Sequence, residues 1–201
     1  MAEASSLRTF RIVLWSLVVV AAVAATLLFV FRPSVVAGPG GGQFALVDQK
    51  GAPVTEAIFK GRPSLLFFGY THCPDVCPTT MGEMQGWFAA LGDEAKTLQG
   101  VFITVDPARD TPEILDGYVS WVSDHLTALS GPQSEIDKVV KDWGAVGEKV
   151  PGEGDDYLMN HTASVFLVDS RGTFFGTIAY GEDTETALGK IRRLIANSPS
   201  A

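Results

Sequence analysis

The chain has 201 residues, of which 46% are hydrophobic and 19% are charged, and its formal net charge is -8 at pH 7. This length allows one domain of ordinary size with a short appendage. The acidic balance, with no basic patch or stripe in the sequence, argues against nucleic acid as a partner.

The appendage is an apolar segment near the N-terminus. Residues 12–31 form a run of twenty residues without a charge, which as a helix spans roughly 30 Å and is long enough to cross a membrane. Arg8 and Arg11 precede the run and Arg32 follows it. The positive-inside rule therefore favours a cytoplasmic segment at 1–11, a transmembrane anchor at 12–31 and an exported C-terminal part.

A cleaved signal peptide is the alternative to the anchor, with residues 35–37 as a small-residue cleavage site. The apolar run is longer than the roughly 7–15 residues of a signal-peptide core, which favours the anchor. Residues 32–42 are rich in proline and glycine and form a flexible linker. We therefore expect a folded domain at 43–201, which is exported in either case.

The first part of this domain predicts a hairpin and a buried strand. Residues 44–47 and 53–55 flank a short turn segment at 48–51, which is the pattern of a β-hairpin. Residues 64–70 are continuously apolar rather than alternating, as expected of a strand that is buried on both faces.

The rest of the domain alternates helices and strands. Met81 and Met84 share the apolar face of a helix that follows the cysteines, so they are assigned to the core and not to a metal. Asp106 and Asp110 flank the next helix start, where they either cap the helix or contact a partner; Thr111 is a second candidate cap. Strands are expected at 101–105, 127–130, 144–150, 164–168 and 173–178, and helices at about 112–126, 134–143 and 188–195. This order predicts an α/β, thioredoxin-like sandwich with an N-terminal β-hairpin.

Both cysteines of the chain, Cys73 and Cys77, lie between the buried strand and the helix that follows it. Pro78 suits the first position of that helix, so Cys77 is expected at the helix N-terminus, where N–H groups favour a thiolate. A purely structural disulfide is the alternative, but so short a loop gains little stability from a bridge. Thioredoxin-type exchange normally uses Cys-x-x-Cys, and the extra residue here leaves room for an ion.

A third ligand is needed, because two thiolates seldom complete a metal site. His125 is assigned to a helix end, and His72 points away from Cys73 if their segment is extended. His161 reaches the cysteines if the strand 164–168 lies beside the strand 64–70, although an ordinary loop histidine is the alternative. Two thiolates and one imidazole suit Cu(I), whereas structural zinc normally takes four protein ligands.

Three motifs resemble the SCO/SenC (PrrC-like) family of copper-binding, thioredoxin-like cytochrome c oxidase assembly proteins. They are GYTHCPDVCP at 69–78, VDPARDTP at 105–112 and His161 ahead of the strand 164–168. The resemblance implies a copper protein of the bacterial inner membrane that faces the periplasm, with Cys73, Cys77 and His161 as metal ligands. Asn160 stands where many members have an acidic residue, which puts the outer contacts of the site in doubt but not the ligand.

The resemblance leaves two functions open. In the first, a copper metallochaperone delivers copper to, or matures, the CuA centre of cytochrome c oxidase subunit II, with other copper chaperones as further partners. In the second, a membrane-anchored thiol–disulfide oxidoreductase reduces partner cysteines through Cys73 and Cys77. His161 separates the two, because copper retention requires it and thiol exchange does not. A peroxidase built on Thr71 and Arg109 is a third alternative, which the Cys-x3-Cys pair fits poorly.

Overall fold

The computed structural model describes residues 11, 14–20, 23, 39–152 and 156–198. It divides the chain into two units, Met1–Ala37 and Gly38–Ala201. The predicted anchor at 12–31 lies mostly outside the described residues, as do the segment 1–10 and most of the predicted linker; residues 14–20 and 23 are helical. Within the described ranges, no helix is both long and apolar enough to cross a membrane.

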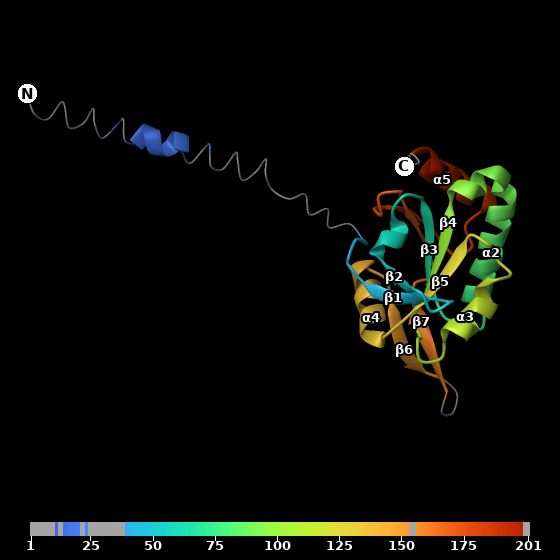
Figure 1. The fold of residues 1–201 in the computed structure, drawn as a ribbon. Coiled ribbons are helices and arrows are strands. Elements are labelled where there is room, and N and C mark those ends of the chain that lie inside the picture. The colour runs from blue at the N-terminus through green and yellow to red at the C-terminus, as the bar shows by residue number, and fades with distance from the viewer. Residues whose placement is uncertain (1–10, 12–13, 21–22, 24–38, 153–155, 199–201) are drawn as a thin grey trace, which may run out of the picture. The chain divides into compact units, whose positions relative to one another are not determined.

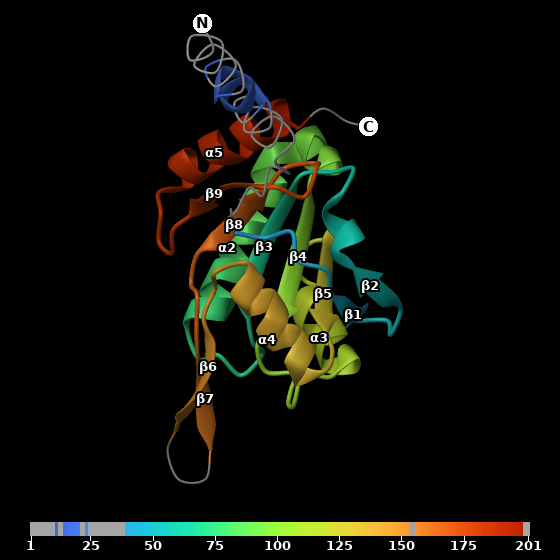
Figure 2. The same cartoon turned by 90° about the vertical axis from the view of Figure 1, so that its left-hand side faces the viewer.

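A seven-stranded sheet forms the centre of the second unit, in the order β2-β1-β5-β4-β3-β8-β9 (Figure 1; β8 and β9 are labelled in Figure 2). Strands β3, β4 and β5 run parallel, and each outer strand is antiparallel to its inner neighbour. The predicted α/β sandwich with an N-terminal β-hairpin is confirmed. The strands are β1 (Ala45–Asp48), β2 (Pro53–Thr55), β3 (Ser64–Gly69), β4 (Gln99–Thr104), β5 (Leu126–Ser130), β8 (Val165–Val168) and β9 (Phe174–Ile178).

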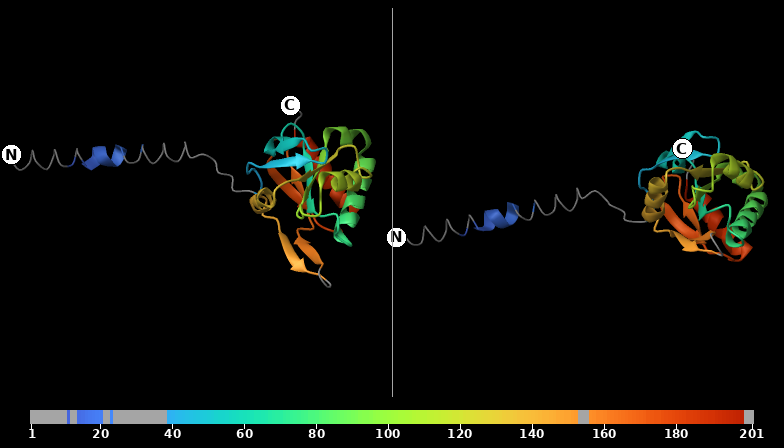
Figure 3. Two further views of the ribbon diagram at one scale, coloured as in Figure 1. Left: turned by 60° about the horizontal axis from the view of Figure 1, so that its bottom comes forward. Right: turned by 90° about the horizontal axis from the view of Figure 1, so that it is seen from below.

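Helices cover both faces of this sheet (Figures 2 and 3). The connections β3-α2-β4 and β4-α3-β5 step in the same direction, so right-handed crossovers place α2 and α3 on one face. Helix α5 packs beside α2, and α4 lies on the opposite face (Figure 3). The helices are α2 (Val76–Leu91), α3 (Pro112–Val119), α4 (Gln133–Asp142) and α5 (Thr184–Ala196), with 3-10 turns η1 (Glu56–Phe59) and η2 (Gly92–Thr97).

The two central strands explain the continuous apolar segments of the sequence. Every residue of β3 and of β4 is buried, because helices cover both faces. Met81 and Met84 of α2 are fully buried in the same core, as predicted. Burying a side chain of this size contributes about 1.5–3 kcal/mol, so this core is the main source of stability for the site above it.

Two helix predictions are wrong in detail. Helix α3 ends at Val119, and Leu126 instead begins β5, where it pairs with Gly100 of β4. His125 is therefore not at a helix end, because pairing with the buried strand β4 outweighs the helical spacing of the apolar residues. The helix predicted at 134–143 is α4, which begins one residue earlier, at Gln133, after Pro132.

A two-stranded ribbon of β6 (Gly147–Pro151) and β7 (Tyr157–His161) stands apart from the main sheet (Figure 2). Strand β6 falls within the predicted strand 144–150 apart from its last residue, but β7 was not predicted. Leu158 is exposed on the outer side of β7, so the polar–apolar alternation that marks a strand is missing.

The end of the predicted linker packs on the domain. The N–H group of Gly40 donates to the carbonyl of Asp142 over 2.7 Å. Gly40 has a φ of 95°, and a Cβ there would lie 2.7 Å from the ring of Trp143. Only glycine satisfies both the backbone conformation and the close approach to the ring.

The topology brings three loops to one end of the sheet. Gly69 at the end of β3 pairs with Thr104 at the end of β4, so the cysteine loop and the β4–α3 loop are neighbours. Strand β8 is antiparallel to β3, with Leu66 beside Phe166. The start of β8, and the end of β7 just before it, therefore lie at the same end of the sheet as the cysteines.

Candidate metal centre

The cysteine loop turns directly into helix α2. The helix begins at Val76, so Cys77 is its second residue and Pro78 its third, two positions later than predicted for Pro78. Proline is tolerated there because the first-turn N–H groups have no partner within the helix. The N–H group of Cys77 donates to Cys73 Sγ over 3.4 Å. The helix N-terminus therefore points a donor at the sulfur of Cys73.

Cys77 is fully buried. Its sulfur lies against the end of β3, where a Cβ on Gly69 would come within 2.9 Å of Cys77 Sγ and of the Phe102 ring. Burial raises the pKa of the Cys77 thiol, and the nearby Cys73 sulfur raises it further. The prediction that the helix start makes Cys77 a thiolate is therefore wrong for the metal-free protein. A bound cation reverses this balance, because metal binding deprotonates the thiols that coordinate it.

His161 ends strand β7 with its ring aimed at the two sulfurs. Its Nε2 atom lies 3.3 Å from Cys77 Sγ and 3.7 Å from Cys73 Sγ. Its Nδ1 atom lies 3.1 Å from the carbonyl of Thr162, which only an N–H group at Nδ1 can satisfy. Burial lowers the pKa of the imidazole, so the ring is neutral at pH 7. The Nε2 lone pair therefore faces the thiols.

Aromatic rings fix the orientation of His161. Phe67 and Tyr70 meet the imidazole edge to face, with ring centroids 5.9 and 5.7 Å away. On the outer side, the site opens into a pocket of about 210 Å³ beside Cys73, Pro74 and Met159. Cys73 and His161 are partly exposed and border this pocket while Cys77 is buried, so another molecule can approach the site from the side of Cys73 and His161.

The structure brings together the three residues that the sequence predicted as metal ligands. One ligand atom from each of Cys73, Cys77 and His161 lies within 4.8 Å of the other two, and the described residues hold no other such group of three. His72 is exposed and its Nδ1 contacts Thr71. His125 packs against Phe88 with ring centroids 6.2 Å apart. Neither of these two histidines belongs to the group.

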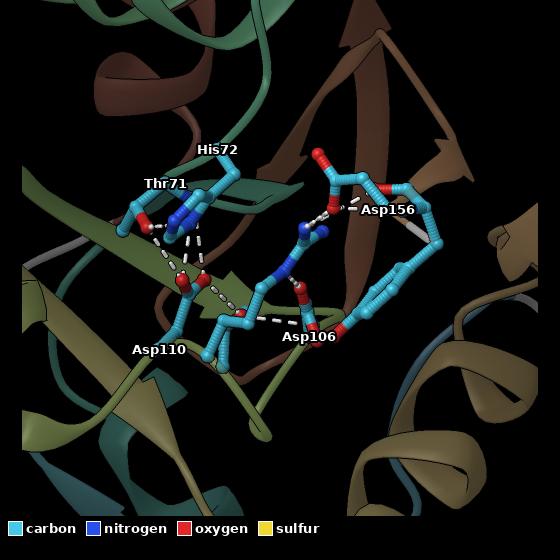
Figure 4. A network of polar contacts seen from close by, with 8 residues as sticks. Thr71, His72, Asp106, Asp110 and Asp156 are labelled. Atoms are coloured by element: carbon cyan, nitrogen blue, oxygen red, sulfur yellow. Dashed lines mark hydrogen bonds and ion pairs between the residues drawn. The ribbon is translucent and has the colours of Figure 1, made fainter. Parts of the chain in front are cut away.

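Asp106 and Asp110 are not helix caps. Thr111 caps α3, because its hydroxyl accepts from the N–H group of Ile114. Asp110 is fully buried and accepts from the hydroxyls of Thr71 and Thr104 over 2.6 and 2.5 Å (Figure 4). The sequence did not reveal this role, and the role of Gly69 was also missed, although a glycine at a strand end signals a close approach of this kind.

The family profile of SCO1/SenC matches residues 35–196. The chain belongs to the SCO1/SenC family. The resemblance carried by the motifs at 69–78, 105–112 and His161 is thereby confirmed.

The relatives of this SCO1/SenC protein include copper-bound structures. Bradyrhizobium japonicum ScoI with copper bound is 43% identical with a TM-score of 0.70, covering 77% of this chain and 98% of that one. Yeast Sco1 with copper bound is 32% identical with a TM-score of 0.71, covering 80% and 91%. The mitochondrial protein SCO2 of Saccharomyces cerevisiae is 36% identical over 159 residues, 77% of this chain. The chain spans 52% of the length of that relative. The predicted thioredoxin-like fold is confirmed by the structural likeness.

Proposed function

We propose that this SCO1/SenC protein binds one copper ion through Cys73 Sγ, Cys77 Sγ and His161 Nε2 and passes it to a partner protein. The observation that carries the proposal is the convergence of these three atoms within 4.8 Å. Thiolate and imidazole are soft donors that suit Cu(I), and no fourth His, Cys, Asp or Glu joins the group among the described residues. Copper in the solved relatives named above supports the choice of metal.

The partner that we propose is subunit II of cytochrome c oxidase, whose CuA centre receives the copper, with other copper chaperones as donors. Transfer between proteins requires that incoming ligands reach the metal before the old ones leave. Cys73 is partly exposed and borders the open pocket, so a partner thiol can reach the site there. Cys77 is the buried ligand of the three, so it would release the copper last.

A second function is favoured by the different burial of the two cysteines. Both are free thiols, and the partly exposed one, Cys73, has a helix N–H group aimed at its sulfur. The Cys73 thiolate would attack a partner disulfide and form a mixed disulfide, releasing one partner thiolate. Cys77, after losing its proton, would then attack Cys73 Sγ and release the second partner thiolate. The partner gains two electrons and the Cys73–Cys77 pair becomes a disulfide.

One experiment separates the two functions. The full-length protein loaded with Cu(I) is mixed with metal-free, reduced subunit II domain, and the metal-free protein is mixed with oxidised subunit II domain. We expect copper transfer in the first mixture, and we expect His161→Ala to abolish it while His125→Ala leaves it unchanged. Retention of all copper by the wild-type protein contradicts delivery. New thiols in the second mixture, at equal rates for wild type and His161→Ala, would establish the reductase function instead.

We also propose that the protein is held in a bacterial inner membrane by residues 12–31, with the second unit in the periplasm. The charge-free run with arginines on its N-terminal side supports this placement. Fractionation of cells that express the full chain tests it. We expect the protein in the membrane fraction after a carbonate wash, whereas recovery as a shortened, soluble form indicates a cleaved signal peptide.

A further inference from the structure

The loop between β4 and α3, residues 105–111, contacts both segments that carry the proposed ligands (Figure 4). We infer that Asp106 and Arg109 of this loop, together with Tyr157 of β7, are positioning residues that set the place of His161 against the two thiols. The inference rests on the proposed function, since it concerns the same site, and it assigns a role to residues outside the ligand set.

Arg109 and Asp106 hold the side chain of Tyr157. The hydroxyl of Tyr157 donates to Asp106 Oδ1 over 2.8 Å, and Arg109 Nε donates to the other oxygen of the same carboxylate. The guanidinium carbon of Arg109 lies 3.7 Å from the centroid of the Tyr157 ring. Both partners of Tyr157 are largely buried, with 4% of the Asp106 side chain and 18% of the Arg109 side chain exposed. Charged contacts of this kind are strong because little water competes for them.

Arg109 also holds the backbone of Tyr157. Its Nη1 atom donates to the carbonyl of Tyr157 and to Asp156 Oδ1, each over 3.1 Å (Figure 4). A planar guanidinium presents its donors in a fixed geometry. The single side chain of Arg109 therefore fixes both the backbone and the ring of Tyr157 relative to the β4–α3 loop. Lys149 of β6 adds a second cation, with its Nζ atom 3.5 Å from the Tyr157 ring centroid.

The position of Tyr157 matters for His161 because both lie on one short strand. Residues 157, 159 and 161 point to the same side of β7, and Met159 between them is buried. Among the described residues, strand β7 pairs with β6 and not with the main sheet. The ladder of the main sheet therefore does not fix β7. The rings of Phe67 and Tyr70 hold the imidazole at the end of the strand, and the contacts of Tyr157 with the β4–α3 loop anchor its start.

The same loop holds the cysteines from the other side. Asp110 accepts from the N–H group and from the hydroxyl of Thr71, two residues before Cys73. The β4–α3 loop is thus hydrogen-bonded to Thr71, shortly before Cys73, and to Tyr157, shortly before His161. The distance between the thiols and the imidazole therefore depends on the hydrogen bonds of this loop, which begins at the buried end of β4.

Arg109→Lys tests the inference, because lysine keeps the charge but loses the fork of donors. We expect Cu(I) binding, measured by competition with bicinchoninate on the full-length protein, to weaken about 10-fold, as is typical when contacts behind a metal ligand are removed. Tyr157→Phe, which keeps the ring and loses only the hydroxyl bond, should act in the same direction. Arg171→Lys is the matched control, since its ion pair with Asp169 lies beyond the opposite end of β3.

The decisive comparison is made in the His161→Ala background. A positioning residue that acts through His161 has no further effect there, whereas a general loss of stability weakens copper binding in both backgrounds. Equal losses in the two backgrounds, or wild-type affinity of Arg109→Lys, overturn the inference. The ring resonances of His161 in the metal-free protein provide a readout without copper. We expect them to move in Arg109→Lys and not in Arg171→Lys, and unchanged resonances overturn the positioning role even if the proposed function fails.

Discussion

Replacing Cys73 or Cys77 with serine is expected to weaken Cu(I) binding by more than about 100-fold, beyond the 10- to 100-fold typical of contacts behind a ligand. Serine is close to cysteine in size but replaces a soft sulfur by a hard oxygen, which Cu(I) binds poorly. The remaining thiol and His161 form a two-donor site. Competition titration with bicinchoninate under reducing conditions measures the loss of Cu(I) affinity for each variant. The number of copper ions retained per protein should fall from one in the wild type toward zero in the variants.

Met84→Leu is the matched control for these variants. Met84 also carries a soft sulfur, but it is fully buried in the core below the site. Leucine conserves the volume of methionine, so the fold is expected to tolerate the change with a cost below about 1.5 kcal/mol. Copper affinity should stay at the wild-type level. Wild-type affinity in Cys73→Ser or Cys77→Ser, or a large loss in Met84→Leu, contradicts the proposed ligand set.

Asp110→Ala is expected to destabilise the domain by about 3 kcal/mol, the largest effect on stability that we predict outside the core. Asp110 is fully buried and accepts from three donors, the N–H group and the hydroxyl of Thr71 and the hydroxyl of Thr104. Removing the carboxylate leaves buried donors without an acceptor, which costs more than the bonds themselves contribute. For a domain of this size the loss corresponds to a fall of roughly 6–12 °C in Tm. Thermal unfolding of the metal-free protein, followed by circular dichroism, measures it.

Two further variants serve as controls for Asp110→Ala. Asp110→Asn keeps the shape of the side chain and one acceptor oxygen, so its loss should lie between wild type and Asp110→Ala. Asp93→Ala removes a carboxylate that is 93% exposed and pairs with Lys96 at the surface, and such a change typically stays within about 0.5 kcal/mol. An Asp110→Ala protein as stable as Asp93→Ala would show that the buried hydrogen bonds of the β4–α3 loop do not hold the cysteine loop.

The parts of the fold that depend on local pattern were accessible from the sequence. The apolar segments around Leu66 and Phe102 predicted buried strands, and Thr111 followed by proline predicted the start of α3. The meeting of His161 with the cysteines followed from one assumption, that β8 lies beside β3, and the structure has this pairing. These features depend on patterns within a few residues and on one pairing of strands.

The parts that depend on distant partners were not accessible. Asp110 contacts Thr71, 39 residues away, and Asp106 contacts Tyr157, 51 residues away, so their positions next to a helix start suggested capping instead. The raised pKa of Cys77 results from burial against the end of β3, which the helix position alone does not show. In the described part of the chain, strand β7 pairs with β6 alone, and its Leu158 side chain is exposed. The strand therefore lacks the alternation of apolar and polar residues by which a strand is recognised. The membrane anchor stays a prediction.

X-ray absorption spectroscopy of the full-length protein loaded with one equivalent of Cu(I) tests the central claim most directly. We predict a first coordination sphere of two sulfur donors and one nitrogen donor, with the outer-ring scattering of an imidazole. The imidazole signal should vanish in His161→Ala and persist in His125→Ala. A sphere of sulfur donors alone in the wild-type protein, or an imidazole signal that survives in His161→Ala, would contradict the assignment of Cys73, Cys77 and His161 as the copper site.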